Sequence, residues 1–328
     1  MRKGSFNGLE YEINANNTVI ITAGDEKAQE ISVPATIEDR LVVGIGKRAF
    51  AHCRALERVT LPEGIETIDS AAFKSCTELK HINLPESLKT IGQSAFYGCN
   101  ELTVMELGAK VEEIGERAFY GCGILDINAA ADSEYFYSID GVLFDKRNNT
   151  LVAFAKDEIF TDYSVPEGTK GIARSAFYGC GELRSVRIPE GVEYIYETAF
   201  FGCGELGSVK LPESLEVIGG AAFRDCTALE EIELPNAVDR MGNVVFSNCV
   251  LLKSVRLPDR LMAVSDMLFS GCEDLESVSF GNEITHIGIM VFHDCPNMKR
   301  IYYRGTKEEW DRIDTVESFD GIEIVFEQ

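Results

Sequence analysis

The chain has 328 residues, of which 54 are acidic and 31 basic, and its formal net charge is −23. This balance argues against binding to nucleic acid or to anionic membrane surfaces, because both require basic patches. Hydrophobic residues make up 45% of the chain, which is enough for a substantial core. The sequence has no apolar run long enough to cross a membrane, and no apolar segment typical of a signal peptide follows Arg2 and Lys3. We therefore expect a cytoplasmic protein from the sequence as given, or a cell-surface or secreted protein if a native signal precedes it.

Residues 1–41 predict an N-terminal cap hairpin. Two runs rich in β-branched and aromatic residues, Leu9-Glu-Tyr-Glu-Ile and Thr18-Val-Ile-Ile-Thr, flank the turn residues Asn16-Asn17. We expect this hairpin to cover the first coil of the segment that follows.

Residues 42–127 and 167–303 repeat with a period of 23 residues, with a gap of 58 between the last phenylalanine of one run and the first of the next. Each of the 10 cysteines lies three residues after a phenylalanine. A strict period of this length is typical of a solenoid, in which each repeat forms one coil. The pairs are Phe50/Cys53, Phe73/Cys76, Phe96/Cys99, Phe119/Cys122, Phe177/Cys180, Phe200/Cys203, Phe223/Cys226, Phe246/Cys249, Phe269/Cys272 and Phe292/Cys295.

Each repeat predicts one short strand and one tight turn. The pattern Leu-x-x-Val-x-Leu-Pro, as in Leu56 to Pro62, fits a strand with alternate side chains inward, which ends at a proline that lacks the amide for further pairing. The Ala-Phe-x-x-Cys segment fits a short turn, a 3₁₀ turn or a one-turn helix. A glycine such as Gly92 or Gly219 often follows a buried isoleucine, where we expect the backbone to turn or to lie against its neighbour.

The cysteines occupy one slot of the repeat, so their side chains should form a file along the stack. Parallel side chains at equivalent positions suit packing better than the geometry of a disulfide. A closed metal site needs clustered ligands, which a single file does not provide. We favour buried free thiols over disulfides and over metal, and we expect no cofactor.

Residues 128–166 depart from the period and predict a degenerate repeat with an inserted hairpin. Phe154 keeps the 23-residue spacing to Phe177, Asp157 stands where cysteine belongs, and Phe160, Tyr163, Val165 and Pro166 keep the strand pattern. Gly141-Val-Leu-Phe-Asp and Thr150-Leu-Val-Ala-Phe should form the hairpin around Lys146-Arg-Asn-Asn. The insert is either structural or a flap that shapes a ligand site.

Residues 304–328 predict a C-terminal cap. Thr306-Lys-Glu-Glu309 is a capping-box pattern that opens a short helix carrying Trp310 and Ile313, and Ile322 to Phe326 should form a last strand. We assign Trp310 to the core of the cap in preference to a binding hot spot.

The repeat pattern resembles the BspA-like leucine-rich repeat family. The motif Ile-Gly-x-x-Ala-Phe-x-x-Cys-x-x-Leu-x-x-Val-x-Leu-Pro is nearly complete in Ile91 to Leu107 and in Ile218 to Pro235. The resemblance covers roughly residues 30–303 and implies a right-handed leucine-rich repeat solenoid, with a parallel β-sheet on the concave face and short turns or one-turn helices opposite. With the two caps, we expect residues 1–328 to form a single domain. The resemblance also implies binding or adhesion, often on bacterial surfaces.

Two rows of side chains are candidate ligand-binding sites. Beside the central valine of each strand, Arg187, Lys210, Glu233 and Arg256 follow one another at the same slot. They form either a cross-strand charge ladder or a recognition strip on the sheet face. Directly after the phenylalanines stand Tyr97, Tyr120, Tyr178 and Phe201, with Tyr194 and Tyr196 nearby. These rings either bind a ligand or pack on one another between coils.

Nothing in the sequence favours catalysis. The chain has 4 histidines, and none stands in a pattern with a nucleophile and an orienting acid. We expect a non-catalytic, monomeric module that binds a protein or a glycan, with no metal, no nucleic acid and no direct membrane insertion. The alternatives are an intracellular bacterial scaffold for protein–protein interaction and a structural spacer of a longer surface protein.

Overall fold

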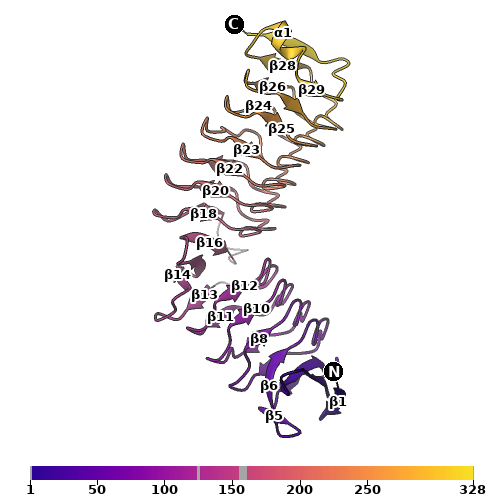
Figure 1. The fold of residues 1–328 in the computed structure, drawn as a ribbon, viewed down its shortest axis with the longest axis vertical. Coiled ribbons are helices and arrows are strands. Elements are labelled where there is room, and N and C mark those ends of the chain that lie inside the picture. The colour runs from indigo at the N-terminus through magenta and orange to yellow at the C-terminus, as the bar shows by residue number, and fades with distance from the viewer. Residues whose placement is uncertain (1, 124–125, 155–160, 328) are drawn as a thin grey trace. The chain divides into compact units, whose positions relative to one another are not determined.

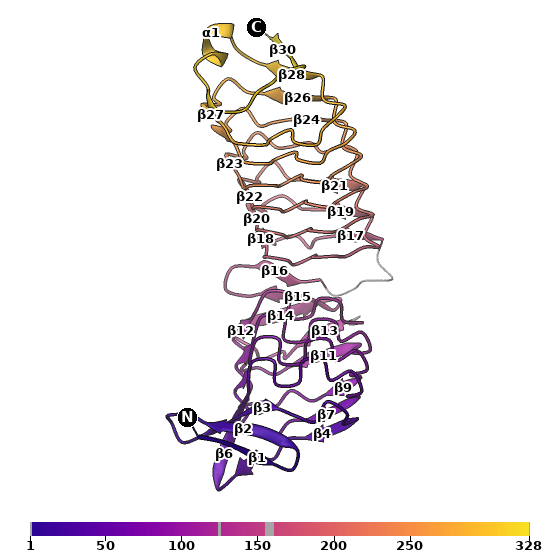
Figure 2. The same ribbon diagram turned by 90° about the vertical axis from the view of Figure 1, so that its right-hand side faces the viewer.

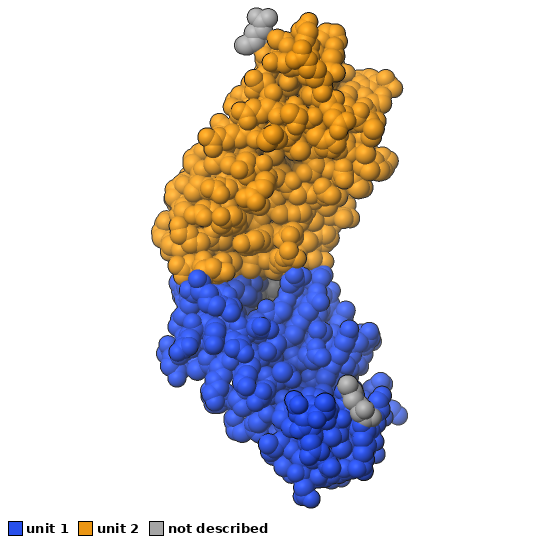
Figure 3. All heavy atoms as spheres, viewed as in Figure 1, with its two compact units in different colours: residues 1–147, 152–157 blue, residues 148–151, 158–328 orange. Residues whose placement is uncertain are grey.

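The computed structural model describes residues 2–123, 126–154 and 161–327, arranged in two compact units. Unit 1 comprises residues 1–147 and 152–157, and unit 2 comprises residues 148–151 and 158–328 (Figure 3). Each unit is a stack of coils that follow one another along the chain (Figure 1). The expectation that residues 1–328 form a single domain stays a prediction.

Unit 1 begins with three antiparallel strands, β1 (Arg2–Phe6), β2 (Leu9–Ile13) and β3 (Val19–Ala23). The hairpin of β2 and β3 is the one that the sequence predicts. The sequence analysis missed β1, which joins β2 through a turn at Asn7 and Gly8 with φ angles of 48° and 80°. An Asn-Gly pair tolerates this left-handed backbone at low cost, which is why it favours tight hairpins.

Each coil of unit 1 contributes to two parallel ladders of hydrogen bonds (Figure 2). We call the first the valine ladder, because its strands carry the predicted central valine or its equivalent. It contains β4 (Glu30–Ser32), β7 (Arg58–Thr60) and β9 (His81–Ile82), and further along β11 (Val104–Leu107) and β13 (Asp126–Ala129). We call the second the isoleucine ladder. It joins β3 to β6 (Arg40–Ile45), β8 (Thr67–Ile68), β10 (Thr90–Ile91) and β12 (Glu113–Ile114), while β5 (Thr36–Ile37) pairs antiparallel with β6.

Unit 2 repeats this arrangement. Its valine ladder contains β17 (Asp162–Ser164), β19 (Ser185–Arg187) and β21 (Ser208–Lys210), and further along β24 (Ser254–Arg256), β26 (Ser277–Phe280), β28 (Arg300–Tyr303) and β30 (Glu323–Phe326). Its isoleucine ladder contains the start of β16 (Thr150–Ala153), then β18 (Gly171–Ile172), β20 (Tyr194–Ile195), β22 (Val217–Ile218) and β23 (Arg240–Met241), and separately β25 (Ala263–Val264), β27 (His286–Ile287) and β29 (Asp314–Thr315).

The irregular segment keeps a coil and adds a hairpin, as expected. Tyr163 pairs with Val186, so the degenerate repeat stays in register with the next one. Both strands of the expected hairpin are present, as β15 (Val142–Asp145) and β16. A further strand, β14 (Phe136–Ile139), pairs antiparallel with β15 and was missed. The predictions for Asp157 and Phe160 lie outside the described residues.

The core of each unit is a column of phenylalanine rings beside a file of thiols. Phe73 stacks on Phe96 with centroids 5.4 Å apart, and Phe200 stacks on Phe223 at 5.2 Å. All ten cysteines are buried and free, as predicted. Most donate a hydrogen bond to the carbonyl of the phenylalanine one coil earlier; the Cys76 Sγ lies 3.0 Å from the Phe50 oxygen. Cysteine suits this slot because it is a small hydrophobic side chain with a weak S–H donor.

The segments between the two ladders, which carry Phe and Cys, are short turns and not helices. In each of the ten coils with a Phe–Cys pair, the residues two before and two after the phenylalanine have positive φ; around Phe73 these are Ala71 at 56° and Ser75 at 59°. Two left-handed residues so close together interrupt any helical run. Of the alternatives that the sequence allowed, the short turn is the one found.

The C-terminal cap has the predicted elements. Helix α1 (Lys307–Trp310) begins with a complete capping box between Thr306 and Glu309. Trp310 contacts the rings of Tyr303 at 5.2 Å and Phe319 at 5.5 Å, so it belongs to the core of the cap. Strand β30 pairs in parallel with β28 where the sequence places a last strand.

Candidate functional site

The sheet face of unit 2 carries the candidate cations Arg187 and Lys210. Strands β19 and β21 pair in parallel register, which places Arg187 next to Lys210 and buries Val186 and Val209 on the opposite side. Both cations are exposed. Alternation along the strands therefore turns the two charges outward, side by side.

Neither Arg187 nor Lys210 makes an ion pair with any residue of the described parts of unit 2. Like charges on adjacent strands are unfavourable, so this pair contributes nothing to the stability of the fold. Glu233, further along the row, is exposed and likewise makes no ion pair with the described residues. The Arg256 guanidinium lies 3.8 Å from the carboxylate of Asp259 on its own coil.

A cross-strand charge ladder exists, but its residues lie seven positions after the phenylalanine of their coil, whereas Arg187 and Lys210 lie ten positions after theirs. There Lys80 pairs with Glu57 at 3.1 Å, Lys253 with Glu230 at 2.6 Å and Lys299 with Glu276 at 3.2 Å. The sequence signal was available, because each of these pairs has opposite charges spaced 23 residues apart. The charges of Arg187 and Lys210 therefore stand apart from the ion pairs of the scaffold.

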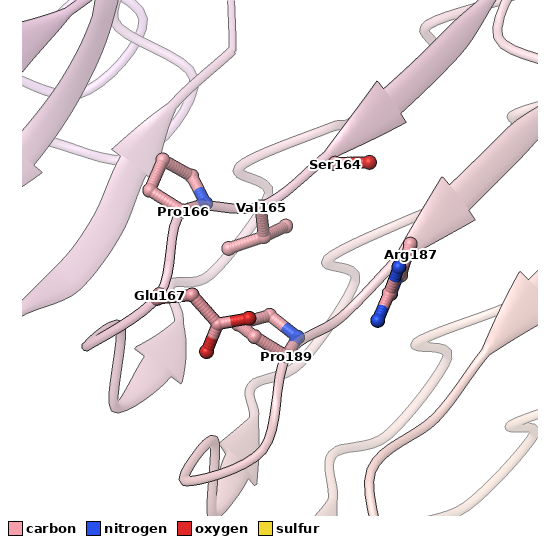
Figure 4. Close-up of a pocket in the computed structure, with 6 residues that line it drawn as sticks. All are labelled: Ser164, Val165, Pro166, Glu167, Arg187 and Pro189. Atoms are coloured by element: carbon pink, nitrogen blue, oxygen red, sulfur yellow. The ribbon is translucent and has the colours of Figure 1, made fainter.

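A pocket opens beside Arg187. Its volume is about 280 Å³, and it is lined by Ser164, Val165, Pro166, Glu167, Arg187 and Pro189. Figure 4 shows Arg187 on β19 and Ser164 on the preceding strand, β17, with the Glu167 side chain directed toward Pro189. The walls combine one cation and one carboxylate with apolar proline and valine surface. The pocket lies where the degenerate repeat meets the first regular coil of unit 2, and sequence reasoning missed it.

The four candidate aromatic residues form two pairs, one in each unit. Tyr97 and Tyr120 pack with centroids 4.8 Å apart, and Tyr178 stacks on Phe201 at 4.9 Å with an interplanar angle of 3°. A cation flanks each pair, since the Lys74 ammonium lies 4.7 Å from the Tyr97 centroid and the Arg224 guanidinium 5.6 Å from that of Phe201. All four rings are half-buried. This geometry is that of packing between coils, and a binding role for these rings stays a prediction.

The described residues include no group of three or more His, Cys, Asp and Glu side chains that could hold a metal ion. Within the same residues, no helix has the length and apolar character needed to cross a bilayer. Two histidines contact acids: the His286 Nδ1 lies 3.2 Å from Asp314, and the His293 Nε2 lies 3.3 Å from Asp294. The side chains of both pairs are exposed.

The fold and this sheet face define the class of protein: a parallel β-solenoid built of 23-residue coils. The sequence profile of the BspA type leucine rich repeat region matches residues 24–149, 151–275 and 219–312, with six copies. The chain belongs to the BspA-type leucine-rich repeat family.

Several solved structures share the fold. A leucine rich cell surface protein from Faecalibacterium prausnitzii A2-165 has a TM-score of 0.61 at 22% identity, covering 97% of this chain and 99% of its own. The pneumococcal vaccine antigen PcpA has a TM-score of 0.59 at 20% identity, covering 100% and 94%. A leucine-rich repeat protein from Eubacterium ventriosum has a TM-score of 0.60 at 18% identity, covering 90% and 82%. A search of curated proteins gave no match.

Proposed function

We propose that this chain is a non-catalytic module that binds an acidic segment of a partner protein on the sheet face of unit 2. Arg187 and Lys210 form the centre of the surface, and the adjacent pocket takes a side chain of the partner. We also propose that the module works at a bacterial cell surface, because the structurally similar F. prausnitzii protein is a leucine rich cell surface protein.

The observation that carries the proposal is the unpaired state of two adjacent cations. On a chain with net charge −23, several exposed cations of the scaffold, such as Lys80, Lys253 and Lys299, are neutralised by a carboxylate one coil away. Arg187 and Lys210 instead repel each other without a described counter-ion. An acidic partner would relieve that repulsion and would gain two charge-assisted hydrogen bonds.

The pocket beside Arg187 provides an apolar cavity next to the two cations. At about 280 Å³ it has room for one side chain, and its valine and proline walls offer apolar contact next to the Arg187 guanidinium. A small number of polar groups in an apolar hollow is the usual composition of a specific site.

The test is capture with the immobilised full chain, offered host matrix proteins, lysate of its own cell and a glycan panel in parallel. We expect a protein to be captured and the Arg187→Ala/Lys210→Ala variant to lose at least about tenfold in affinity. The matched control is Lys253→Ala, which removes an equally exposed cation that is paired with Glu230. Capture of glycans alone, or equal capture by the double variant and the control, would contradict the proposal.

A further inference from the structure

A second surface of unit 2, on the isoleucine ladder, carries two tyrosines that the repeat does not require. Tyr194 lies in β20 and Tyr196 directly follows it, so both side chains leave the same face while Ile195 between them is buried. Their rings are nearly parallel, with centroids 6.0 Å apart and an interplanar angle of 20°. Tyr196 is 40% exposed, and Tyr194 is half-buried.

The neighbouring coils leave these rings uncovered. The register partners of Tyr194 are Gly171 on β18 and Val217 on β22, both smaller than tyrosine (Figure 1). Beside Tyr196, Gly219 brings only backbone, which packs against the Tyr196 and Glu197 main chain. Tyrosines at these two slots occur in this coil alone. The equivalent residues elsewhere are Gly44, Thr67, Thr90, Glu113, Gly171, Val217, Arg240, Ala263 and His286 for the first slot, and Gly46, Asp69, Gly92, Gly115, Ala173, Gly219, Gly242, Ser265 and Gly288 for the second.

Three carboxylates and two cations lie around the rings, so carboxylate is in slight excess there. Glu193 lies 3.7 Å from Lys170, and Glu197 lies 2.7 Å from Arg174. The Glu216 carboxylate makes no ion pair with a described residue, and together with Glu193 it raises the pKa of the Tyr194 hydroxyl. That hydroxyl therefore stays protonated at neutral pH and can donate a hydrogen bond.

We infer that Tyr194 and Tyr196 form a binding platform for a neutral oligosaccharide. The faces of sugar rings present C–H groups that pack on exposed aromatic rings, and sugar hydroxyls donate to carboxylates such as those of Glu193 and Glu216. The excess carboxylate disfavours anionic ligands by charge repulsion. The tyrosines and carboxylates would contact sugar ring faces and hydroxyl groups. This recognition therefore does not require the reducing end of the oligosaccharide or a particular glycosidic linkage.

This platform is separate from the surface proposed above. The tyrosines lie on the isoleucine ladder, whereas Arg187 and Lys210 lie on the valine ladder. Each surface can therefore be removed without changing the other, and failure of one proposal leaves the other to its own test.

The experiment is calorimetric titration of the full chain with four neutral hexasaccharides: cellohexaose, maltohexaose, chitohexaose and mannohexaose. We expect saturable binding of at least one, a loss of at least about tenfold in affinity for Tyr196→Ala, and recovery in Tyr196→Phe, which keeps the ring. Tyr302→Ala, a half-exposed tyrosine on the valine ladder, should bind as the native chain does.

A second variant and a folding control test the binding platform independently. Val217→Arg leaves both tyrosines in place but sets a long charged side chain beside Tyr194, and it should also weaken binding. The thermal unfolding midpoint of each variant shows whether the coil is intact. No binding of any hexasaccharide by the native chain, or binding by Tyr196→Ala and Val217→Arg as tight as that of the native chain, would overturn the inference.

Discussion

The Cys226 thiol donates a hydrogen bond to the backbone carbonyl of Phe200, 3.2 Å away and one coil earlier. The same carbonyl accepts the backbone amide of Cys203, three residues further along the chain. One oxygen therefore receives a bond from its own coil and another from the next. The same relationship is found at other cysteines, among them Cys76 and Cys295, and cysteine suits the slot because its thiol can donate this bond.

Replacing Cys226 with alanine should destabilise the protein. The change removes one hydrogen bond and leaves a small cavity at a fully buried position, at a cost of about 1–3 kcal/mol. The measurement is the urea midpoint, with Ser208→Ala as a control at an exposed position of the same unit. An unchanged midpoint for Cys226→Ala would show that neither the hydrogen bond of the thiol nor its volume stabilises the fold.

The thiols should resist Ellman reagent in the folded protein and react fully once it is unfolded. Burial raises the pKa of Cys53 to about 12 and that of Cys295 to about 11, from an ordinary value of 9.0. Higher pKa means less thiolate, which is the reactive form. Fewer than ten reactive thiols after denaturation without reductant would indicate disulfides. Among the slow native reactions, we expect Cys295, with the smaller shift, to react before Cys53.

Stability should fall at alkaline pH. Desolvation raises the pKa of Cys226, Cys249 and Cys272 well above 9.0 in the folded state. Below that value both states hold the proton and nothing is lost. Above it the unfolded chain releases protons that the folded chain keeps, so the free energy of unfolding decreases by about 1.4 kcal/mol per pH unit for each such thiol. Urea unfolding at about pH 8 and about pH 10 measures this, and equal midpoints at both values would contradict it.

Gly92→Ala should destabilise unit 1 because two backbones meet at this glycine. A Cβ at Gly92 would lie 2.5 Å from the Ser70 amide nitrogen and 2.7 Å from the Asp69 carbonyl carbon. Neither atom can move aside without shifting a coil, and overpacking of this kind costs about 1–3 kcal/mol. Gly207→Ala is the matched control, since its nearest atom would be an ordinary 3.5 Å away. Gly92→Ala should therefore have a lower thermal unfolding midpoint than Gly207→Ala. Similar midpoints would show that the added methyl group at Gly92 does not collide with the neighbouring backbone.

The repeat pattern predicted what depends on the period. The phenylalanine column, the buried thiols, the valine ladder and the capping box at Thr306 all follow from residues that recur or from a local motif with a known geometry. The isoleucine ladder was missed because most of its strands, such as Thr67–Ile68, are two residues long and show no alternation. A strand of that length is visible only when its neighbours are in place.

The candidate surfaces were predicted only as rows of residues. Slot position showed that Arg187 and Lys210 are neighbours, but whether a carboxylate reaches them depends on the rotamers of long side chains across coils. The half-buried state of Tyr97 and Tyr178 likewise depends on their ring neighbours, Tyr120 and Phe201. The open setting of Tyr196 depends on glycines in other coils, whose effect appears only in three dimensions.

The spacing of the Cys–Phe bonds, 26 residues in each case, limits how such a chain can change in length. Inserting a single amino acid inside a coil would pull the thiol whose 26-residue spacing spans it away from its carbonyl, whereas duplicating or deleting a whole coil would preserve every spacing. Evolution of this family should therefore proceed by complete units, each lengthening the available surface by roughly 4.8 Å. Extra material is tolerated where it loops out between registered strands, as the hairpin of β14 and β15 does.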